Sequence, residues 1–331
     1  MHFVTHFTIA LISLVAIVLA CILFTNAIEF LGNKLKLGNN ATGSILAVIG
    51  TGLPELIVPI VAILGATYAD IKIDIAQDIA LGAILGSPFM LSTLALFLLY
   101  FVLISKNKKQ LYLDITFIQR DYKYFLLAYF TAILFSFNFL NNYKIIASLL
   151  LLLLYIIFVY RTIIKSRTTC VECECEKIYF NFKNENLALF VQLFFSLLIL
   201  VLASHYFVGE IKYFSLSFGI SPAILALLIT PFATELPECI NSIIWLKQGK
   251  DELAIANILG AVVFQTTLLF SIGIILTPWI LSKDLLIVSM LTIFGGISFL
   301  FLTFKNKKID LISLLFCGII YFSYLVFLFV K

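Results

Sequence analysis

The chain alternates between long apolar runs and short polar clusters, and this alternation limits its possible folds more than any other feature. Ten runs can be placed, at about residues 7–32, 41–65, 76–104, 122–140, 144–165, 187–209, 221–246, 252–277, 284–304 and 309–330. In hydrocarbon, a run such as Ile145 to Val159 satisfies its backbone hydrogen bonds only as a helix. The pattern predicts an all-α polytopic membrane protein with ten transmembrane helices.

Composition supports this fold class and excludes several others. Of the 331 residues, 62% are hydrophobic and 12% are charged. A soluble domain is expected to carry about 25% charged residues, because water must wet its surface. We therefore set aside soluble enzymes, nucleic-acid-binding proteins and secreted disulfide scaffolds, and we expect the lipid bilayer to be a partner and nucleic acid not to be one.

The basic residues predict the orientation of the chain. If the N-terminus is outside, the inner loops hold every Lys and Arg of the 22 except Lys72, Lys144, Lys212, Lys283 and Lys331. Cytoplasmic loops retain positive charge. We therefore expect a protein of the cell (cytoplasmic) membrane with both termini outside and residues 166–186 in the cytoplasm. The first run is interpreted as a retained span, because it has neither a basic leader nor a small-residue cleavage site.

The chain contains an internal repeat. The segment Thr51-Gly52-Leu53-Pro54-Glu55 matches Thr234-Glu235-Leu236-Pro237-Glu238, 183 positions later, and the nine residues from Asp78 match those from Glu252, 174 positions later. Residues 1–165 and 187–331 each hold five spans, so the second half is predicted to be inverted relative to the first. Residues 166–186 link the two halves. Inverted repeats with interrupted helices are typical of secondary transporters that bind ions near the membrane midplane.

Four acidic residues lie well inside apolar runs, namely Glu29, Glu55, Glu235 and Glu238. A carboxylate at mid-membrane costs about 2.5–3.5 kcal/mol on insertion scales, so it normally faces a cavity, a partner or a cation. Glu55 and Glu238 occupy equivalent repeat positions and are the main candidates. Glu29 has no counterpart in the repeat and is interpreted as structural or near the inner interface.

The residues around the paired glutamates offer further oxygen atoms. Each glutamate follows a proline, which cannot donate to the carbonyl four residues earlier, that of Gly50 or of Ala233. Thr51 and Thr234 precede the glutamates by four residues and so share their helix face. An all-oxygen set suits a hard cation such as Ca²⁺. The alternative is that the prolines only kink packed helices and that the acids are neutral or hydrogen-bonded.

These two segments resemble the paired alpha-repeats of the cation/Ca²⁺ exchanger superfamily, nearest its sodium/calcium exchanger branch, and the chain looks like a divergent prokaryotic-type member. The motifs cover residues 50–91 and 230–265. The resemblance implies a secondary active antiporter, not an enzyme and without a cofactor, that exchanges Ca²⁺ for Na⁺ or H⁺ by alternating access. It also implies that the central Ca²⁺ ligands are Glu55 and Glu238.

Other motif positions are matched only in part. By resemblance, Thr51, Thr234 and Ser87 also contribute to ion sites. The serine after each motif threonine is replaced by Gly52 and Glu235, and the second-half counterpart of Ser87 is Ala261. The family usually has Asn or Asp at the positions of Leu91 and Gln265. The candidate ion-binding set is Glu55, Glu238, Thr51, Thr234, Glu235, Ser87, Gln265, Gly50 and Ala233.

These departures bear on the coupling ion. The lost serine and asparagine oxygens weaken the case for several Na⁺ sites. Glu235 adds a carboxylate three residues from Glu238, and neighbouring carboxylates disfavour each other's charge, which favours proton binding. We expect coupling to H⁺ to be at least as plausible as coupling to Na⁺. Another divalent substrate is an open alternative, while stoichiometry and oligomeric state are not predicted.

The linker carries Cys170, Cys173 and Cys175 between glutamates. Three reduced thiols at this spacing could bind a soft metal, although no fourth ligand is evident nearby. The plainer interpretation is an acidic, flexible tether.

Two rival classes remain. A channel for a divalent cation would also use acidic rings, but an inverted repeat with broken helices favours alternating access. An intramembrane enzyme is less favoured, because the sequence has no H-E-x-x-H helix and none of its three histidines stands beside the paired glutamates.

Overall fold

The structure is a computed structural model, which describes all residues except 1, 53–54, 56–72, 112, 138, 169–176, 181, 183, 218–226, 229 and 331. Seven helices in the described part are long and apolar enough to cross a membrane: Phe3–Lys34, Ala80–Ser105, Lys144–Lys165, Glu185–Phe207, Asp251–Leu276, Lys283–Asn306 and Leu311–Leu328. The predicted predominance of long apolar helices is therefore confirmed. The second predicted span, 41–65, lies within the described residues only at 41–52 and at Glu55.

The first half of the chain contains α1 (His2–Lys34), α2 (Asn39–Ala41), the π-helical segment η1 (Thr42–Ala47), α3 (Val48–Thr51), α5 (Ile73–Met90), the π-helical segment η2 (Leu91–Ala95), α6 (Leu96–Ser105), α7 (Ile115–Leu134), the 3₁₀ turn η3 (Asn141–Tyr143) and α8 (Lys144–Thr168). The second half contains α9 (Glu185–Ser217), α11 (Thr230–Thr234), α12 (Leu236–Lys247), α13 (Asp251–Phe264), the π-helical segment η5 (Gln265–Leu269), α14 (Phe270–Leu276), α15 (Lys283–Asn306) and α16 (Leu311–Val330).

One short antiparallel strand pair supplements the helices. Strand β1 (Gln110–Leu111), which follows α6, pairs with β2 (Ile309–Asp310), which precedes α16. Gln110 lies opposite Asp310 in this register. The pair ties the α6–α7 connection to the α15–α16 connection.

The fourth span begins earlier than the sequence predicts. The apolar run predicts a span over 122–140, whereas α7 covers Ile115–Leu134. Asp114 caps the helix, because its carboxylate accepts a hydrogen bond from the Thr116 backbone N–H at 2.8 Å. The polar first turns of α7 do not read as an apolar run, so hydropathy alone placed the start too late.

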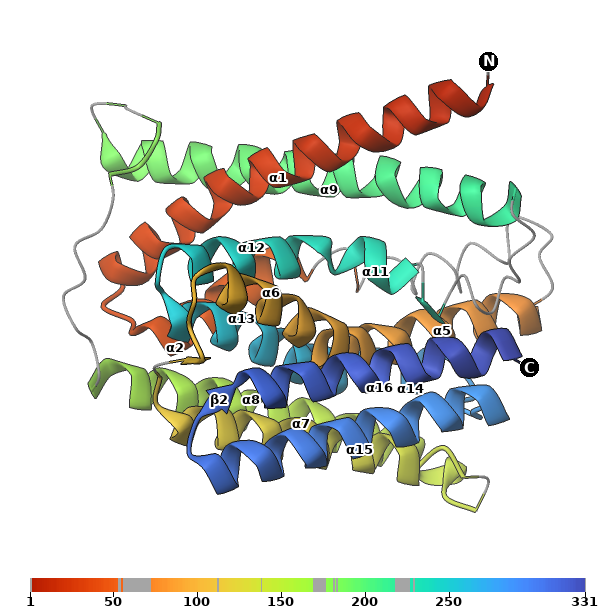
Figure 1. Ribbon diagram of the computed structural model, residues 1–331. Helices are drawn as coiled ribbons and strands as arrows, with labels where there is room; N and C mark the ends of the chain where they lie inside the picture. The colour runs from red at the N-terminus through yellow and green to blue at the C-terminus, as the bar shows by residue number, and fades with distance from the viewer. Residues whose placement is uncertain are drawn as a thin grey trace.

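The two termini lie at the same end of the molecule (Figure 1). The last residues of α8 and the first residues of α9 lie at the opposite end (Figure 1). The first half therefore runs from one end to the other, and the second half runs back.

Helices α1 and α9 pack side by side along one face (Figure 1). The broken helices α11 and α12 lie beneath them, while α7, α8, α15 and α16 lie further away (Figure 1). Large apolar side chains on the outer helices are exposed, such as Ile12 at 63% on α1 and Phe190 at 68% on α9. Such a surface suits lipid, since exposed apolar area on this scale is costly in water.

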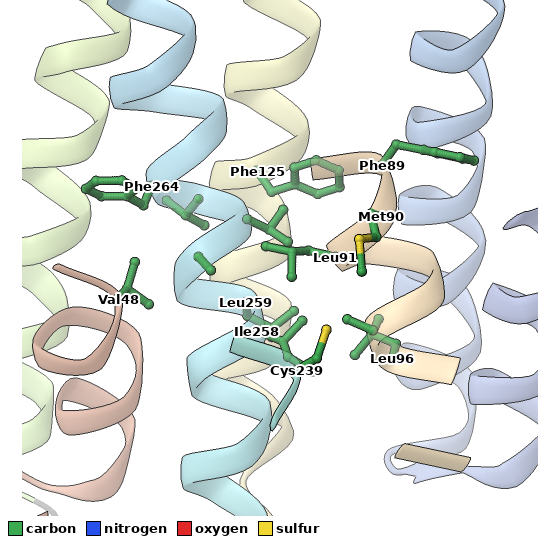
Figure 2. Packing of buried hydrophobic residues seen from close by; sticks show 14 of the residues in the cluster. Val48, Phe89, Met90, Leu91, Leu96, Phe125, Cys239, Ile258, Leu259 and Phe264 are labelled. Carbon is green, nitrogen blue, oxygen red and sulfur yellow. The ribbon is translucent and has the colours of Figure 1, made fainter. Parts of the chain in front are cut away.

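A hydrophobic core surrounds the broken helices. Figure 2 shows Met90, Leu91 and Leu96 beside Cys239, Ile258 and Leu259, so the η2 region packs against α12 and α13. All six side chains are buried. The face of α12 that carries Cys239 therefore packs against apolar side chains.

Two glycines allow helices from different halves to cross closely. A Cβ at Gly86 of α5 would overlap the carbonyl oxygen of Leu227, and a Cβ at Gly260 of α13 would overlap the backbone of Ser44 in η1. Ser44 and Leu227 are 183 positions apart, and Gly86 and Gly260 are 174 apart, which are the two offsets of the sequence repeat. The same crossing therefore occurs twice. In one crossing the glycine comes from the first half, and in the other it comes from the second half.

Candidate ion-binding site

Both repeat motifs interrupt a helix at the same point. Helix α3 ends at Thr51, and α11 ends at the equivalent Thr234. Glu235 then has φ −85° and ψ 0°, and α12 begins with Pro237 in its first turn. A proline is tolerated there because the first helical N–H groups have no intrahelical acceptor. The break places the motif side chains at helix ends, inside the molecule.

Three carboxylates meet at these breaks. One oxygen atom from each of Glu55, Glu235 and Glu238 lies within 4.8 Å of the other two. All three side chains are buried, with residue exposures of 3%, 0% and 1%. The cluster joins the halves, because Glu55 comes from the first motif and the other two come from the second.

Most of these carboxylate oxygens have no hydrogen-bond partner among the described residues. This holds for both oxygens of Glu55, both of Glu238, and Oε2 of Glu235. Buried polar atoms are normally paired, since each unpaired one forfeits its interaction with water. An unpaired set that converges on one point is the arrangement expected of ligands for a cation.

Neutral polar groups complete the surroundings. The Gln265 side-chain Nε2 donates to Glu235 Oε1 at 2.7 Å. The Ser87 hydroxyl also lies beside the Glu235 carboxylate, and the Thr51 hydroxyl lies beside that of Glu238. These groups come from η5, α5 and α3, so the elements around the two breaks all contribute.

The two motif threonines can each donate a hydrogen bond to a backbone carbonyl one turn earlier. Thr51 Oγ1 donates to the Ala47 carbonyl at 3.1 Å, and Thr234 Oγ1 donates to the Pro231 carbonyl at 3.4 Å. Each hydroxyl oxygen then retains lone pairs that can accept or coordinate. Both threonines are buried.

No Lys or Arg side chain neutralises the three carboxylates within the described part of the chain. The Lys and Arg ion pairs found there are Lys108–Asp251, Arg120–Asp121, Lys165–Asp114 and Lys250–Glu29. Three buried negative charges without a counter-charge are strongly unfavourable. The site therefore requires bound cations or protons.

Other sequence candidates lie elsewhere. Glu29 accepts hydrogen bonds from Trp245 Nε1 and from Lys250, and so ties the end of α1 to α12 and the turn before α13. Gly50 lies in α3 against Phe24, and Ala233 lies in α11. Pro54, and the linker residues Cys170, Cys173 and Cys175, lie outside the described residues, so a soft-metal site there stays a prediction. The other cysteines, Cys21, Cys239 and Cys317, are free and buried.

The structure adds two asparagines that the sequence reasoning did not select. Asn257 Nδ2 donates to the backbone carbonyl of Glu238 at 3.0 Å and to Ser242 Oγ at 2.9 Å. Asn241, one turn after Glu238, is fully buried. A comparison of the two repeat halves points to Asn257, because a polar residue stands there where the first half has the apolar Ala83.

Long lipid-exposed helices around a buried, oxygen-lined, negatively charged site define a helical membrane protein equipped to bind cations. The profile of the family described as sodium/calcium exchanger protein matches residues 5–164 and 188–330. The chain therefore belongs to the sodium/calcium exchanger family, within the cation/Ca²⁺ exchanger superfamily, and it is an integral membrane protein.

Solved structures agree on the fold. The sodium-calcium exchanger NCX_Mj soaked with 2.5 mM Na⁺ and 1 mM Sr²⁺ is 19% identical, with a TM-score of 0.74 and 97% of each chain covered. The same exchanger soaked with 2.5 mM Na⁺ and 0.1 mM Ca²⁺ is 20% identical, with a TM-score of 0.73 and coverages of 98% and 97%. At this identity the likeness establishes the fold alone.

One curated relative also matches. The putative antiporter CaxA of Alkalimonas amylolytica is 34% identical over 64 residues, which are 19% of this chain and 20% of that protein. The match therefore spans about a fifth of the relative's length.

Proposed function

We propose that this protein is a secondary active antiporter that exchanges Ca²⁺ for Na⁺ or H⁺ across the cell membrane. The observation that carries the proposal is the buried cluster of Glu55, Glu235 and Glu238, with oxygens within 4.8 Å of one another. Even if each oxygen lay the full 4.8 Å from the other two, all three would be about 2.8 Å from their common centre, close to the Ca²⁺–oxygen distance of about 2.3–2.6 Å. One Ca²⁺ can therefore contact all three carboxylates without a large rearrangement.

An inverted repeat supports alternating access over a pore. The halves run in opposite directions through the molecule (Figure 1), and each contributes one broken helix to the site. The crossings at Gly86 and Gly260 are exchanged between the halves. We infer two inverted five-helix repeats, 1–165 and 187–331, whose relative rocking exposes the site to each side in turn.

The site also supports a proton as the coupling ion. When Ca²⁺ leaves, three carboxylates remain close together, and they cannot all stay charged in a buried site without another cation. Na⁺ would need further oxygen ligands, yet Leu91 is buried in the apolar core and Ala261 has no polar group. Proton coupling requires only the carboxylates themselves.

The proposal is tested by ⁴⁵Ca²⁺ flux in proteoliposomes under separately imposed Na⁺, K⁺ and H⁺ gradients. We expect Ca²⁺ uptake to require an opposing gradient of the coupling ion. The variants Glu55→Gln and Glu238→Gln should each lower the flux by at least about tenfold, because each removes a charge from the Ca²⁺ ligands. The matched control is Glu185→Gln, which changes an exposed glutamate at the start of α9 and should leave the flux unchanged.

Unchanged flux in both site variants would disprove the site. Flux without any counter-gradient would indicate a channel, and transport of Mn²⁺ or another divalent ion in preference to Ca²⁺ would change the substrate. Uptake driven by Na⁺ and indifferent to ΔpH would refute proton coupling.

A further inference from the structure

Next to the carboxylate cluster, α12 and α13 contain a pair of buried amides that the exchange chemistry described above does not use. Asn241 and Asn257 are both 0% exposed. Neither side-chain polar atom of Asn241, nor Oδ1 of Asn257, has a hydrogen-bond partner among the described residues. Unpaired buried amides are costly, and in native proteins they call for an explanation such as a ligand or water.

Both amides lie near Glu238, one on the same helix and one bonded to its backbone. Asn241 follows Glu238 by three residues on α12, so the two side chains share one helix face. Asn257 Nδ2 is held by the Glu238 carbonyl and Ser242 Oγ, which leaves its Oδ1 as the unpaired atom. The neighbouring Cys239 lies instead among the apolar side chains of the core (Figure 2). The polar face of α12 therefore continues from the carboxylates past Asn241.

This polar face leads toward one end of the molecule. Helix α12 ends at Lys247 and α13 begins at Asp251. Lys250, between them, pairs with Glu29 near the end of α1, which is the end opposite the N-terminus (Figure 1). Along α12 and α13, the two asparagines thus lie between the carboxylates and the end of the molecule where α12 ends and α13 begins.

The repeat has no equivalent on the other side. The first-half counterparts of Asn241 and Asn257 are Val58 and Ala83, which are both apolar. The amides are therefore not part of the repeated sequence pattern, and only the second half carries them.

We propose that Asn241 and Asn257 form a transient subsite for a partly dehydrated cation on the route between the carboxylates and the α12–α13 end. The inference rests on the proposed antiport. Amide oxygens are ordinary ligands for Ca²⁺, and being neutral they bind it more weakly than carboxylates do. Weak, successive binding is what allows an ion to enter and to leave.

The test measures Ca²⁺ transport separately from each side, in vesicles of defined orientation. Asn257→Ala and Asn241→Val introduce the residues of the opposite half. Each should raise the KM for Ca²⁺ presented at the α12–α13 end by about fivefold or more, with the KM at the opposite end within about twofold. Equilibrium Ca²⁺ affinity, measured by calorimetry on the purified protein, should change by less than about threefold, since the carboxylates are retained.

A further variant separates the proposed role from simple packing. Asn257→Asp keeps an oxygen at the Oδ1 position but loses the donor that holds Glu238 and Ser242, and its KM should not rise. Asn26→Ala is the matched control, because Asn26 is a buried asparagine that donates to the Lys177 carbonyl, away from the site. It should leave the KM on both sides unchanged.

Several results would overturn the inference. These are an equal rise in KM on both sides, a rise in Asn257→Asp as large as in Asn257→Ala, or unchanged kinetics in both Asn257→Ala and Asn241→Val. If the wild-type protein carries no Ca²⁺ flux at all, the proposed function fails instead.

Discussion

At the scale of single residues, the site combines Glu235 and Gln265 in an unusual way. Relative to the pattern that the resemblance implies, the carboxylate of Glu235 stands in place of a serine, and the longer Gln265 stands in place of Asn or Asp. The Gln265 amide donates to that carboxylate at 2.7 Å. Gln265 thus fixes the orientation of Glu235, whose other oxygen is left for the cluster.

The charge on Glu235 can be tested apart from its shape. Glu235→Gln removes one of three negative charges, and it should weaken Ca²⁺ binding by about tenfold or more, because a charged ligand is replaced by a neutral oxygen. Isothermal titration calorimetry on the purified protein measures this change. The control Glu185→Gln should bind Ca²⁺ as the wild type does, and equal affinity in Glu235→Gln would show that Glu235 is not a ligand.

At the scale of helices, close approach at the two glycines determines how the halves fit together. Both glycines lie directly before site positions, since Gly86 precedes Ser87 and Gly260 precedes Ala261. Their lack of a side chain lets α5 reach Leu227 and α13 reach Ser44. The spacing of the site therefore depends on these crossings.

Substitution at either crossing should destabilise the protein. Gly86→Ala and Gly260→Ala place a Cβ against backbone atoms, and overpacking of this kind typically costs about 1–3 kcal/mol. Thermal unfolding in detergent should show a lower melting temperature for both variants. In the control Gly209→Ala nothing lies within 4 Å of the new Cβ, and helix propensity should stabilise it by about 0.5–1 kcal/mol.

If Gly86→Ala and Gly260→Ala melted like Gly209→Ala, the helices would not be in close contact at these points.

The start of α7 provides a pH-dependent test outside the membrane-spanning segments. Partial burial acts to raise the pKa of Asp114, but hydrogen bonds from the Thr116 hydroxyl and N–H, together with the charge of Lys165, outweigh it and lower this pKa. Because this pKa is lower in the folded state, charged Asp114 stabilises the fold at pH values above its unfolded pKa of about 3.9. This stabilisation is lost as the pH falls through the folded-state pKa.

Asp114→Ala should therefore cost about 1 kcal/mol near neutral pH, where the cap is fully charged. The difference in melting temperature between wild type and variant should shrink as the pH falls below about 3.9 and through the lowered folded-state pKa, because wild-type Asp114 is then also protonated. The control is Thr116→Ser, which keeps both donors. A difference independent of pH would show that the carboxylate charge plays no part in the cap.

The sequence predicts most of the helices and the pairing of the two motifs, but it does not predict every helix boundary or every unpaired polar atom. Apolar runs and the matching motifs are enough to predict the long helices and the juxtaposition of Glu55 with Glu238, because both follow from hydrophobicity and repeat position. The start of α7 was missed because a polar cap leaves no hydropathy signal. The unpaired oxygens of Asn241 and Asn257 depend on which neighbours they lack, and no single-residue property encodes that.

At the scale of the whole molecule, the layer of α1 and α9 lies over the broken helices, and both termini lie at one end (Figure 1). The distribution of lysine and arginine predicts that this end is outside. The linker would then lie in the cytoplasm.

The native cysteines allow this orientation to be tested. A membrane-impermeant thiol reagent should label Cys170, Cys173 and Cys175 in inside-out vesicles and leave them unlabelled in intact cells, because cytoplasmic loops retain positive charge. Cys21, Cys239 and Cys317 are buried and should not react. With the three linker cysteines changed to serine, the exposed position Asn142→Cys should label only from outside. The reverse pattern would invert the proposed topology.

The π-helical segments add a rotational constraint to the molecule. A π turn holds one residue more than an α turn, so it rotates the following part of the helix by about 100° relative to a continuous α-helix. The segment η2 begins at Leu91 and η5 begins at Gln265, which is the repeat spacing of 174, and both contain five residues. The helix segments that follow, α6 and α14, are therefore rotated by the same amount in the two halves. Deleting one residue from η5 alone would put α14 out of phase with α6, although the apolar composition of the chain would hardly change.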